Sequence, residues 1–544
     1  MQPISRRVFL AGAAAIAIAA CSDDARPAAD GTGAPGATEP GSGASTTAAA
    51  TTTDEPTTST AAPVELPGDP FTIGVASGDP DARGAVLWTR LAPDPLNGGG
   101  MPADDVPVVW EISATPEFTE VVASGTETAT VQHGHSVHAV VPLEQGDWYY
   151  RFRVGGYTSL VGLTRPAPAA GTDVAEARIA AASCQHYESG LYAAHRDIAE
   201  QAPSFVVWLG DYIYEGAGSA NADPADRTHL GPEPTTVEEY RNRYARYKTD
   251  PQLQASHAAC PWFVIWDDHE VENNYAGLAP QEPADAAGFQ ERRFAAYQAW
   301  WEHQPVRLSP PTGAADEYRI YRDAQWGDLV QIALLDGRQY RSDQACGDVA
   351  LSLEPACPEA SDPARTMLGD EQEQWLLDTL GASAATWKLI GNQVIIADAT
   401  FNEAVLNYDQ WDGYQAAREQ LLQSFADAAI ENIVVLTGDI HLAAVAQLRA
   451  GDRAAGPNVG VEFVTTSVSS GGLVGEELTD VLKTFPNLID AELAHRGYSL
   501  HTVTPQQWTA DYRIVTDVAS ADSEVTTFGT YLVAAGSNTV TKAP

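Results

Sequence analysis

The sequence predicts a layered α/β domain preceded by a small antiparallel β-sandwich. Three observations support this fold class. Short alternating strands separated by turn residues occupy residues 71–168 without a helical stretch. From Ala177 onward, apolar runs of strand length alternate with helical segments, and residues 511–540 return to short strands. Alternating strands and helices are typical of layered α/β domains, whereas evenly spaced strands alone are typical of sandwiches.

The first 66 residues are expected to lie outside the folded body. Arg6 and Arg7 precede an apolar stretch, residues 10–20, that is too short to span a bilayer and fits an export signal. The arginine pair resembles a Tat signal, and the IAAC run ending at Cys21 resembles a lipoprotein processing box. We therefore predict a Tat-type lipoprotein signal over residues 1–21, with an ordinary cleaved signal as the alternative. Residues 22–66, rich in Ala, Thr, Gly and Pro, predict a disordered tether.

The charge of the chain limits the classes of ligand. Asp and Glu total 73 against 31 Lys and Arg, which gives a formal net charge of -42. Such a chain repels a phosphate backbone, so specific nucleic-acid binding is not expected. An anionic substrate would need a strong local positive charge, such as a metal cluster.

The sandwich is expected over residues 67–168. Its strand candidates are residues 85–90, 106–113, 130–141 and 147–155. Three histidines lie close together in the third candidate, and we expect them to be exposed surface residues, not metal ligands: His133, His135 and His138.

Cysteines outside the signal have two expected roles before any resemblance is considered. Cys346 and Cys357 lie eleven residues apart in a polar stretch and predict a loop disulfide in an oxidising compartment. Cys260 precedes an apolar run and is expected to be a buried thiol.

Within the larger domain, expected over residues 173–540, five apolar runs end at residues that can bind a metal or a phosphate. The carboxyl ends of such strands share one edge of an open α/β sheet, where sites form. Helical segments are expected at residues 290–304, 370–380 and 414–428. The runs end at Cys184, at Asp211, at the block from Asp267 to Glu270, at Asn392, and at Asp439 with His441.

These residue types favour a two-metal hydrolase. Carboxylates, an amide and a histidine are the usual ligands of such sites. Cys184 and Tyr214 are unusual additions, because a thiol and a phenol become anionic ligands only beside a strongly polarising ion. The pair favours Fe3+, whereas Ca2+ would take the surrounding oxygens.

The motifs resemble those of the PhoD-like alkaline phosphatases, metallophosphoesterases related to the purple acid phosphatases. The resemblance runs from Phe71 to the C-terminus, and it implies a metallophosphoesterase-type layered catalytic domain. The matching blocks are SCQ at 183–185, GDYIYE at 210–215, WDDHEVENN at 266–274, LDGRQYRSD at 335–343, GNQV at 391–394, WDGY at 411–414 and GDIH at 438–441.

The resemblance also implies roles for individual residues. Iron would be held by Cys184, Asp211 as the bridging carboxylate, Tyr214 and His441, with Asp439 a further metal ligand beside His441. Calcium sites would be lined by Asp268, Asn273 and Asp412, and the alternatives Asp267 and Asn274 stay open. His269 would lie near the leaving group, and Arg292, or its neighbour Arg293, would contact the phosphate.

The expected function is extracytoplasmic, metal-dependent hydrolysis of phosphate monoesters and diesters, through attack by a metal-bound hydroxide or oxide. The alternatives are a phospholipase-D-like phosphodiesterase and a non-catalytic surface lipoprotein. The expected partners are phosphate ester substrates and the Tat export machinery, with membrane contact only through the lipid anchor, and the chain is expected to be a monomer.

Overall fold

The computed structural model describes residues 65–544, except residues 221, 223, 225–226, 315–316, 349–353, 402, 473–481 and 483. The predicted signal and almost all of the predicted tether lie outside these residues. Within the described residues, no helix has both the length and the apolar character needed to cross a membrane.

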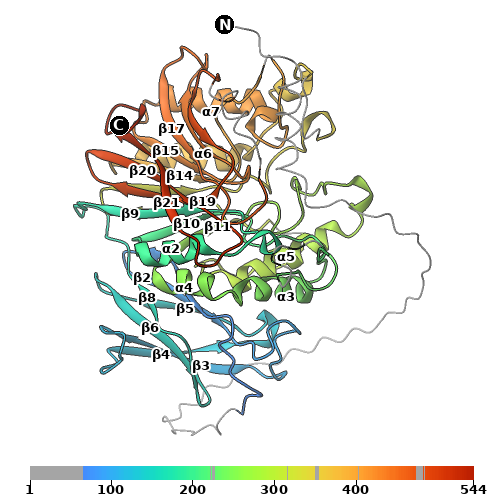
Figure 1. Cartoon of the computed structure of the whole chain (residues 1–544), viewed down its shortest axis with the longest axis vertical. Helices are drawn as coiled ribbons and strands as arrows, with labels where there is room; N and C mark the ends of the chain where they lie inside the picture. The colour runs from blue at the N-terminus through green and yellow to red at the C-terminus, as the bar shows by residue number, and fades with distance from the viewer. Residues whose placement is uncertain are drawn as a thin grey trace, which may run out of the picture.

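Two mixed β-sheets form the body of the molecule (Figure 1). The larger sheet has ten strands in the order β22-β21-β20-β19-β9-β10-β11-β1-β2-β5, and the smaller has seven in the order β12-β13-β14-β15-β17-β16-β18. In the larger sheet these are β1 (Val75–Asp81), β2 (Gly84–Arg90), β5 (Ser136–Pro142), β9 (Ala177–Ala182), β10 (Phe205–Leu209), β11 (Pro261–Ile265), β19 (Arg496–Val503), β20 (Gln507–Val515), β21 (Val525–Ala534) and β22 (Val540–Lys542). In the smaller they are β12 (Arg322–Trp326), β13 (Val330–Leu334), β14 (Trp387–Asn392), β15 (Ile433–Thr437), β16 (Ala443–Arg449), β17 (Asn458–Val464) and β18 (Leu488–Glu492).

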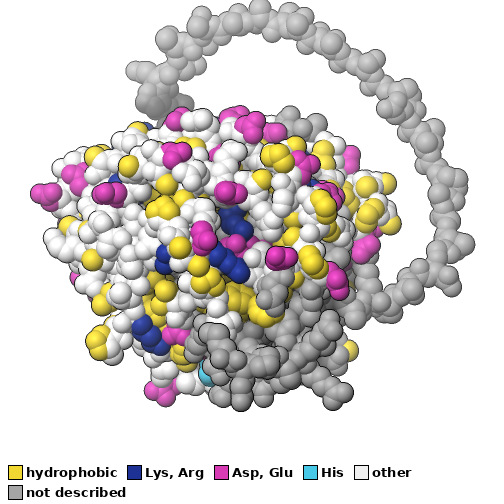
Figure 2. Space-filling view, turned by 90° about the horizontal axis from the view of Figure 1, so that it is seen from above, with side chains coloured by type: hydrophobic (Ala, Val, Ile, Leu, Met, Phe, Trp, Pro, Cys, Tyr) yellow, Lys and Arg dark blue, Asp and Glu magenta, His cyan; other side chains and the backbone are white. Residues whose placement is uncertain are grey.

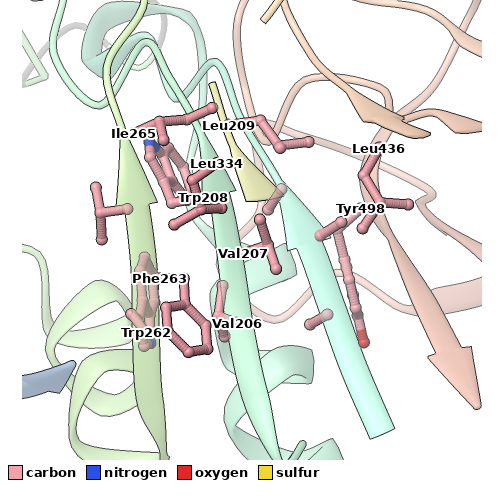
Figure 3. Packing of buried hydrophobic residues seen from close by; sticks show 14 of the residues in the cluster. Val206, Val207, Trp208, Leu209, Trp262, Phe263, Ile265, Leu334, Leu436 and Tyr498 are labelled. Atoms are coloured by element: carbon pink, nitrogen blue, oxygen red, sulfur yellow. The ribbon is translucent and has the colours of Figure 1, made fainter. Parts of the chain in front are cut away.

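The two sheets pack face to face through apolar side chains. Figure 3 shows Val207 and Leu209 of β10 beside Leu334 of β13 and Leu436 of β15, all within one buried cluster. A second cluster joins the other face of the smaller sheet to the helices α6 (Gly369–Ala382) and α7 (Gln415–Asp427). The helices on the side of the larger sheet are α2 (Ala193–Gln201), α3 (Val237–Lys248), α4 (Pro251–Ala259) and α5 (Phe289–His303). The predicted layered α/β architecture is confirmed.

Parallel pairing brings the predicted strand ends together. Strands β9, β10 and β11 are parallel neighbours, with Val206 opposite Ala180 on one side and Trp262 on the other. In the smaller sheet β13, β14 and β15 are parallel neighbours as well. The Gln393 side chain, just past β14, donates to the carbonyl of Trp266, just past β11, at 2.9 Å. The carboxyl ends of both parallel segments therefore meet at one edge of the molecule.

The predicted N-terminal sandwich is present, and one of its sheets belongs to the catalytic body. Strands β1, β2 and β5 face a five-stranded antiparallel sheet across a core that includes Leu87, Val108 and Tyr150. Strand β1 pairs in parallel with β11, so the ten-stranded sheet runs on from the catalytic body into the sandwich. The second sandwich sheet contains β3 (Val106–Ser113), β4 (Ala123–Ala129), β6 (Trp148–Val154), β7 (Tyr157–Thr158) and β8 (Gly162–Thr164).

The prediction of exposed histidines in the sandwich is wrong, because His135 is buried and both His133 and His138 are only partly exposed. His138 stacks on Trp301 of α5, with ring centroids 4.2 Å apart, and its Nε2 lies 3.0 Å from the carbonyls of Trp301 and Gln304. His135 is buried, with its Nε2 3.0 Å from the carbonyl of Asp104. Strand alternation could not reveal that α5 covers one of these positions.

The cysteine predictions that fall on described residues are confirmed. Cys346 and Cys357 form a disulfide with a Cα–Cα distance of 6.5 Å. Cys260 is a free, buried thiol, and so is Cys184.

Candidate metal centre

The site begins with sharp turns directly after buried strands. Cys184 follows β9 with φ of 59°, Asp211 follows β10 with φ of 54°, and Asp439 and His441 follow β15 with φ of 65° and 56°. Non-glycine residues rarely adopt this left-handed conformation, because the Cβ atom crowds the backbone, and such residues tend to cluster at functional sites. The turns leave four chemically active side chains at the shared sheet edge.

A first group of ligating atoms surrounds Tyr214. The ligating atoms of Cys184, Asp211 and His441 lie within 4.8 Å of one another, and all three residues are buried. The Tyr214 hydroxyl lies 3.0 Å from Asp211 Oδ2 and 2.9 Å from His441 Nε2. The hydroxyl has one proton and cannot satisfy both acceptors, whereas a cation at this point would interact with all of them.

Hydrogen bonding fixes the tautomer of His441. Its Nδ1–H donates to the carbonyl of Gly471, which leaves the Nε2 lone pair directed at the group. Burial lowers the pKa of His441 to about 3, and the charge of Arg496 adds to this effect. The imidazole is therefore neutral, as a metal ligand must be.

A second group contains only carboxylates and a histidine. The ligating atoms of Asp267, Asp268 and Asp439 lie within 4.8 Å of one another, and the same is true of Asp211, Asp268 and His269. Asp211 thus belongs to both the first and the second group. Among the described residues, several buried oxygens of this region have no hydrogen-bond partner, namely Asp211 Oδ1, Asp267 Oδ2, Asp268 Oδ1 and Asn392 Oδ1.

Burial opposes the ionisation of these carboxylates. Desolvation raises the pKa of Asp211 and of Asp267 well above the ordinary range, and the charge of Asp268 raises both further. Desolvation, with repulsion from Asp268 and Asp409, raises the pKa of Asp439 to about 7. Cations would stabilise the charged forms and would use the unpaired oxygens. The donor atoms therefore fit metal ions, with sulfur, phenol and imidazole in the first group and oxygens in the second.

Comparisons with known proteins agree with this geometry. Residues 179–512 match the model of the PhoD-like phosphatase family, and residues 57–168 match the model of its N-terminal domain. The chain belongs to the PhoD-like phosphatase family. It is 43% identical over 474 residues to alkaline phosphatase D of Bacillus subtilis, covering 85% of this chain and 80% of the relative.

Two solved structures extend the comparison. A structure of PhoD is 41% identical and superposes with a TM-score of 0.84, covering 88% of this chain and 93% of that chain. A purple acid phosphatase from yellow lupin (Lupinus luteus) seeds is 10% identical with a TM-score of 0.50, covering 86% and 75%, and it shares the fold. As a PhoD-like phosphatase, the chain is a phosphoric ester hydrolase of the metallophosphoesterase type.

His269 has an ordered partner at the rim of the second group. Its Nδ1 lies 2.7 Å from Glu215 Oε2, and the other oxygen of Glu215 accepts from the backbone amide of Asn273 at 2.6 Å. Burial opposes the charged forms of His269 and Glu215, but their mutual attraction outweighs it. The pKa of His269 rises well above 6.5, and that of Glu215 falls to about 2. Glu215 thus favours the protonated form of the imidazole, and its contact with Nδ1 leaves Nε2–H as the remaining donor.

The structure bears on the two alternatives that the family resemblance left open. Asp268 lies with Asp211 and His269 and also with Asp439, whereas Asp267 lies only with Asp268 and Asp439. Both Asp267 and Asp268 therefore lie at the candidate cation positions of the second group. The amide nitrogen of Asn274 donates to Asp348 at 2.8 Å, and this contact leaves the oxygen that would bind a cation uncommitted, so the choice between Asn273 and Asn274 stays open.

Asp412 does not lie in either group. Its carboxylate is paired with Arg418 of α7 and accepts from the amide of Ala399 at 3.1 Å. Because Asp412 lies outside both groups of ligating atoms, the structure gives no support to it as a calcium ligand. Asp409, three residues earlier, lies in the site region instead, 2.8 Å from Arg338.

Arg292 is also engaged elsewhere. Its guanidinium pairs with Glu272 and with Glu233, and its Nε donates to the hydroxyl of Tyr240 at 3.1 Å. All three guanidinium nitrogens thus donate to protein acceptors, so the structure does not support a direct phosphate contact. Arg293 donates to the carbonyl of Gly277.

Glu270 was missed as a site residue, although it belongs to the quoted DDHE block. Its carboxylate accepts from the backbone amides of Asp211 at 3.0 Å and Asp267 at 2.8 Å, and also from that of Tyr212. It therefore ties the loop after β10 to the loop after β11. Amide recognition of this kind depends on loop geometry and leaves no signal in the sequence.

Replacing Asp211 with Asn should remove both metal retention and turnover, because Asp211 is common to both groups. The measurement is metal content by elemental analysis, together with ester hydrolysis, on the purified variant. Asp412→Asn is the matched control, since Asp412 is an equally buried carboxylate outside both groups, and it should retain metal. Full metal content in Asp211→Asn would contradict the assignment.

Proposed function

We propose that the chain is an extracytoplasmic alkaline phosphatase that hydrolyses phosphate monoesters and diesters with Fe3+ and Ca2+. The observation that carries the proposal is the presence of two neighbouring groups of ligating side chains at one sheet edge. Asp211 belongs to the first group and also lies beside Asp268 of the second. Two adjacent cation positions that share a carboxylate suit the in-line displacement of a phosphate ester.

The donor chemistry supports a different ion in each group. Cys184, Tyr214, Asp211 and His441 combine a thiol, a phenol, a carboxyl and an imidazole, a set that suits Fe3+. Asp267, Asp268, Asp439 and the side-chain oxygen of Asn392 or Asn273 would hold Ca2+. When bound, the ions supply Lewis acidity toward the phosphoryl oxygens and a water of lowered pKa.

Acidic side chains are spread widely over the outer surface. Figure 2 shows Asp and Glu side chains at many separate points on one face, with Lys and Arg in fewer places. Together with the net charge of -42, this distribution gives no general attraction for a phosphate anion. Capture of the substrate is therefore assigned to the metal centre itself.

His269 is the residue proposed to assist the leaving group. Glu215 holds its Nδ1, which leaves Nε2–H as the donor, and the side chain is 16% exposed. Its ring lies 4.1 Å from that of Tyr214, so it borders both groups. A proton placed there can neutralise the alkoxide as the ester bond breaks.

Hydrolysis of a nitrophenyl phosphate monoester and the matching bis-ester, at alkaline pH with calcium, tests the proposal. Both esters should be cleaved, and a chelator should abolish both activities, because substrate capture and activation of the water are both assigned to the bound metal ions. The ratio of the two rates decides between phosphatase and phosphodiesterase. Absence of cleavage by folded, metal-loaded protein would refute the proposal.

The assistance assigned to His269 predicts a dependence on the leaving group. For His269→Gln, hydrolysis of an alkyl phosphate should fall by roughly 100-fold or more, as expected when a general acid is lost. Hydrolysis of a nitrophenyl ester, whose leaving group needs little protonation, should fall far less. Equal losses with both substrates would show that His269 does not donate to the leaving group.

An apolar cavity beside the centre favours the phosphodiesterase as a second candidate function. The cavity, of about 80 Å³, is lined by apolar side chains such as Ile395, Leu406 and Phe485. It adjoins the centre through Gln410, which lines it and donates to Asp439 at 2.6 Å, and through Ile440. A diester carrying a small apolar alcohol would suit it, and the bis-ester assay extended to alkyl-substituted diesters tests this.

We further propose export by the Tat route and anchoring through a lipid on Cys21, with the enzyme acting as a monomer. The support is the sequence of residues 1–21 and the tether that follows it. Replacing Arg6 and Arg7 with Lys should retain the chain in the cytoplasm, as measured by fractionation. Replacing Cys21 with Ala should instead release an active chain from the membrane, and unchanged membrane retention would contradict the anchor.

A further inference from the structure

Arg338 lies at the centre of the second group. It belongs to the loop that follows β13, where its backbone amide donates to Asp336 Oδ1 at 3.0 Å and its carbonyl accepts from the amide of Gly277 at 2.8 Å. Its side chain is 0% exposed. A guanidinium buried to this extent keeps its charge and needs acidic partners.

Those partners are the carboxylates of the second group. Arg338 Nε donates to Asp267, and Nη2 lies 3.4 Å from Asp268 Oδ1 and 3.5 Å from Asp439 Oδ1. Nη1 donates to Asp409 at 2.8 Å. The planar guanidinium group of Arg338 thus contacts three carboxylates of the second group, those of Asp267, Asp268 and Asp439.

A basic side chain among the ligating atoms distinguishes the two groups. With Cys184, Tyr214 and Asp211 ionised, the first group carries three negative charges, and the neighbouring Arg496 donates to the backbone carbonyl of His441 at 3.2 Å. In the second group the Arg338 guanidinium contacts the carboxylates themselves, those of Asp267, Asp268 and Asp439, and it also pairs with Asp409. Arg338 therefore places a positive charge directly among the oxygens that would hold a cation.

We propose that Arg338 is a positioning residue that holds these three carboxylates and sets the selectivity of the second group for a divalent over a trivalent ion. This inference rests on the proposed function. Its physical basis is that the repulsion between Arg338 and a bound ion grows with the charge of the ion, so a trivalent ion is disfavoured more than a divalent one.

Arg341 offers a matched control. It is also a buried arginine of the same loop, and it lies 3.1 Å from Asp409 Oδ1 and donates to the Tyr414 hydroxyl at 3.0 Å. The described contacts of Arg341 do not include Asp267, Asp268 or Asp439. Replacing Arg341 therefore removes a buried ion pair similar to one of those of Arg338, but it does not remove a charge that contacts Asp267, Asp268 or Asp439.

The experiment measures the competition between Tb3+ and Ca2+ on the iron-containing chain after calcium has been removed with a chelator. Trp266 directly precedes Asp267 and is buried, so its excitation should sensitise Tb3+ luminescence at the second group. In Arg338→Met the preference for Tb3+ over Ca2+ should rise at least about tenfold, equivalent to about 1.4 kcal/mol. Arg341→Met should keep the wild-type ratio.

Arg338→Lys keeps the positive charge but loses the planar guanidinium that contacts several carboxylates at once. Both Tb3+ and Ca2+ should therefore bind more weakly, with little change in the ratio of their affinities. An unchanged ratio in Arg338→Met, or an equal rise in Arg341→Met, would overturn the inference. If circular dichroism shows that Arg338→Met does not fold, Arg338→Lys tests the inference alone. A tenfold change in the ratio of its Tb3+ and Ca2+ affinities would refute the role of the charge, because the lysine keeps that charge. Failure of the wild-type chain to bind either ion would instead refute the proposed calcium site.

Discussion

Four carboxylates lie close together where the two sheets meet: those of Asp211, Asp267 and Asp268 are buried, and that of Asp439 is partly buried. Removing one carboxylate from water costs several kcal/mol, and mutual repulsion adds to that cost. Arg338 and His269 offset part of the charge, but unpaired oxygens remain on Asp211, Asp267 and Asp268. Metal ions and protons therefore compete for the same atoms, and a pKa of about 7 for Asp439 shows that low pH favours the protons. This competition is consistent with work at alkaline pH.

The scaffold makes this crowding possible by placing rigid strands beneath it. Strands β9, β10 and β11 end beside β14 and β15, and the residues just past β9, β10 and β15 adopt left-handed turns that direct their side chains toward one another. Glu270 then ties two of the loops together through backbone amides. The packed apolar layer between the sheets fixes the strand ends, so the repulsion among the carboxylates cannot be relieved by moving them apart.

Strand ends and sequence motifs predicted that Cys184, Asp211, Tyr214, Asp268, Asp439 and His441 lie close together, because the carboxyl ends of parallel strands meet at one edge of a sheet, and the structure brings these side chains together. They did not predict the surroundings of Asp412 and Arg292, whose ion pairs with Arg418 and with Glu233 and Glu272 depend on how helices pack against loops. The sequence also did not predict that the sandwich and the catalytic body share a sheet, because the pairing of β1 with β11 joins segments that are far apart in the chain.

The distribution of arginine explains how so acidic a chain can act on an anion. Arg292, Arg338 and Arg418, three arginines near the candidate site residues, all pair with carboxylates, whereas Arg496 donates to the backbone carbonyls of His441 and His495. The first three preserve the arrangement of the acids, and the described contacts leave them little freedom to bind phosphate. We therefore assign the capture of the substrate to bound cations, which would reverse the sign of the charge at the site while the outer surface stays acidic (Figure 2). Substrate binding and bond cleavage thus depend on the same ions, and a chain without them would lose both together.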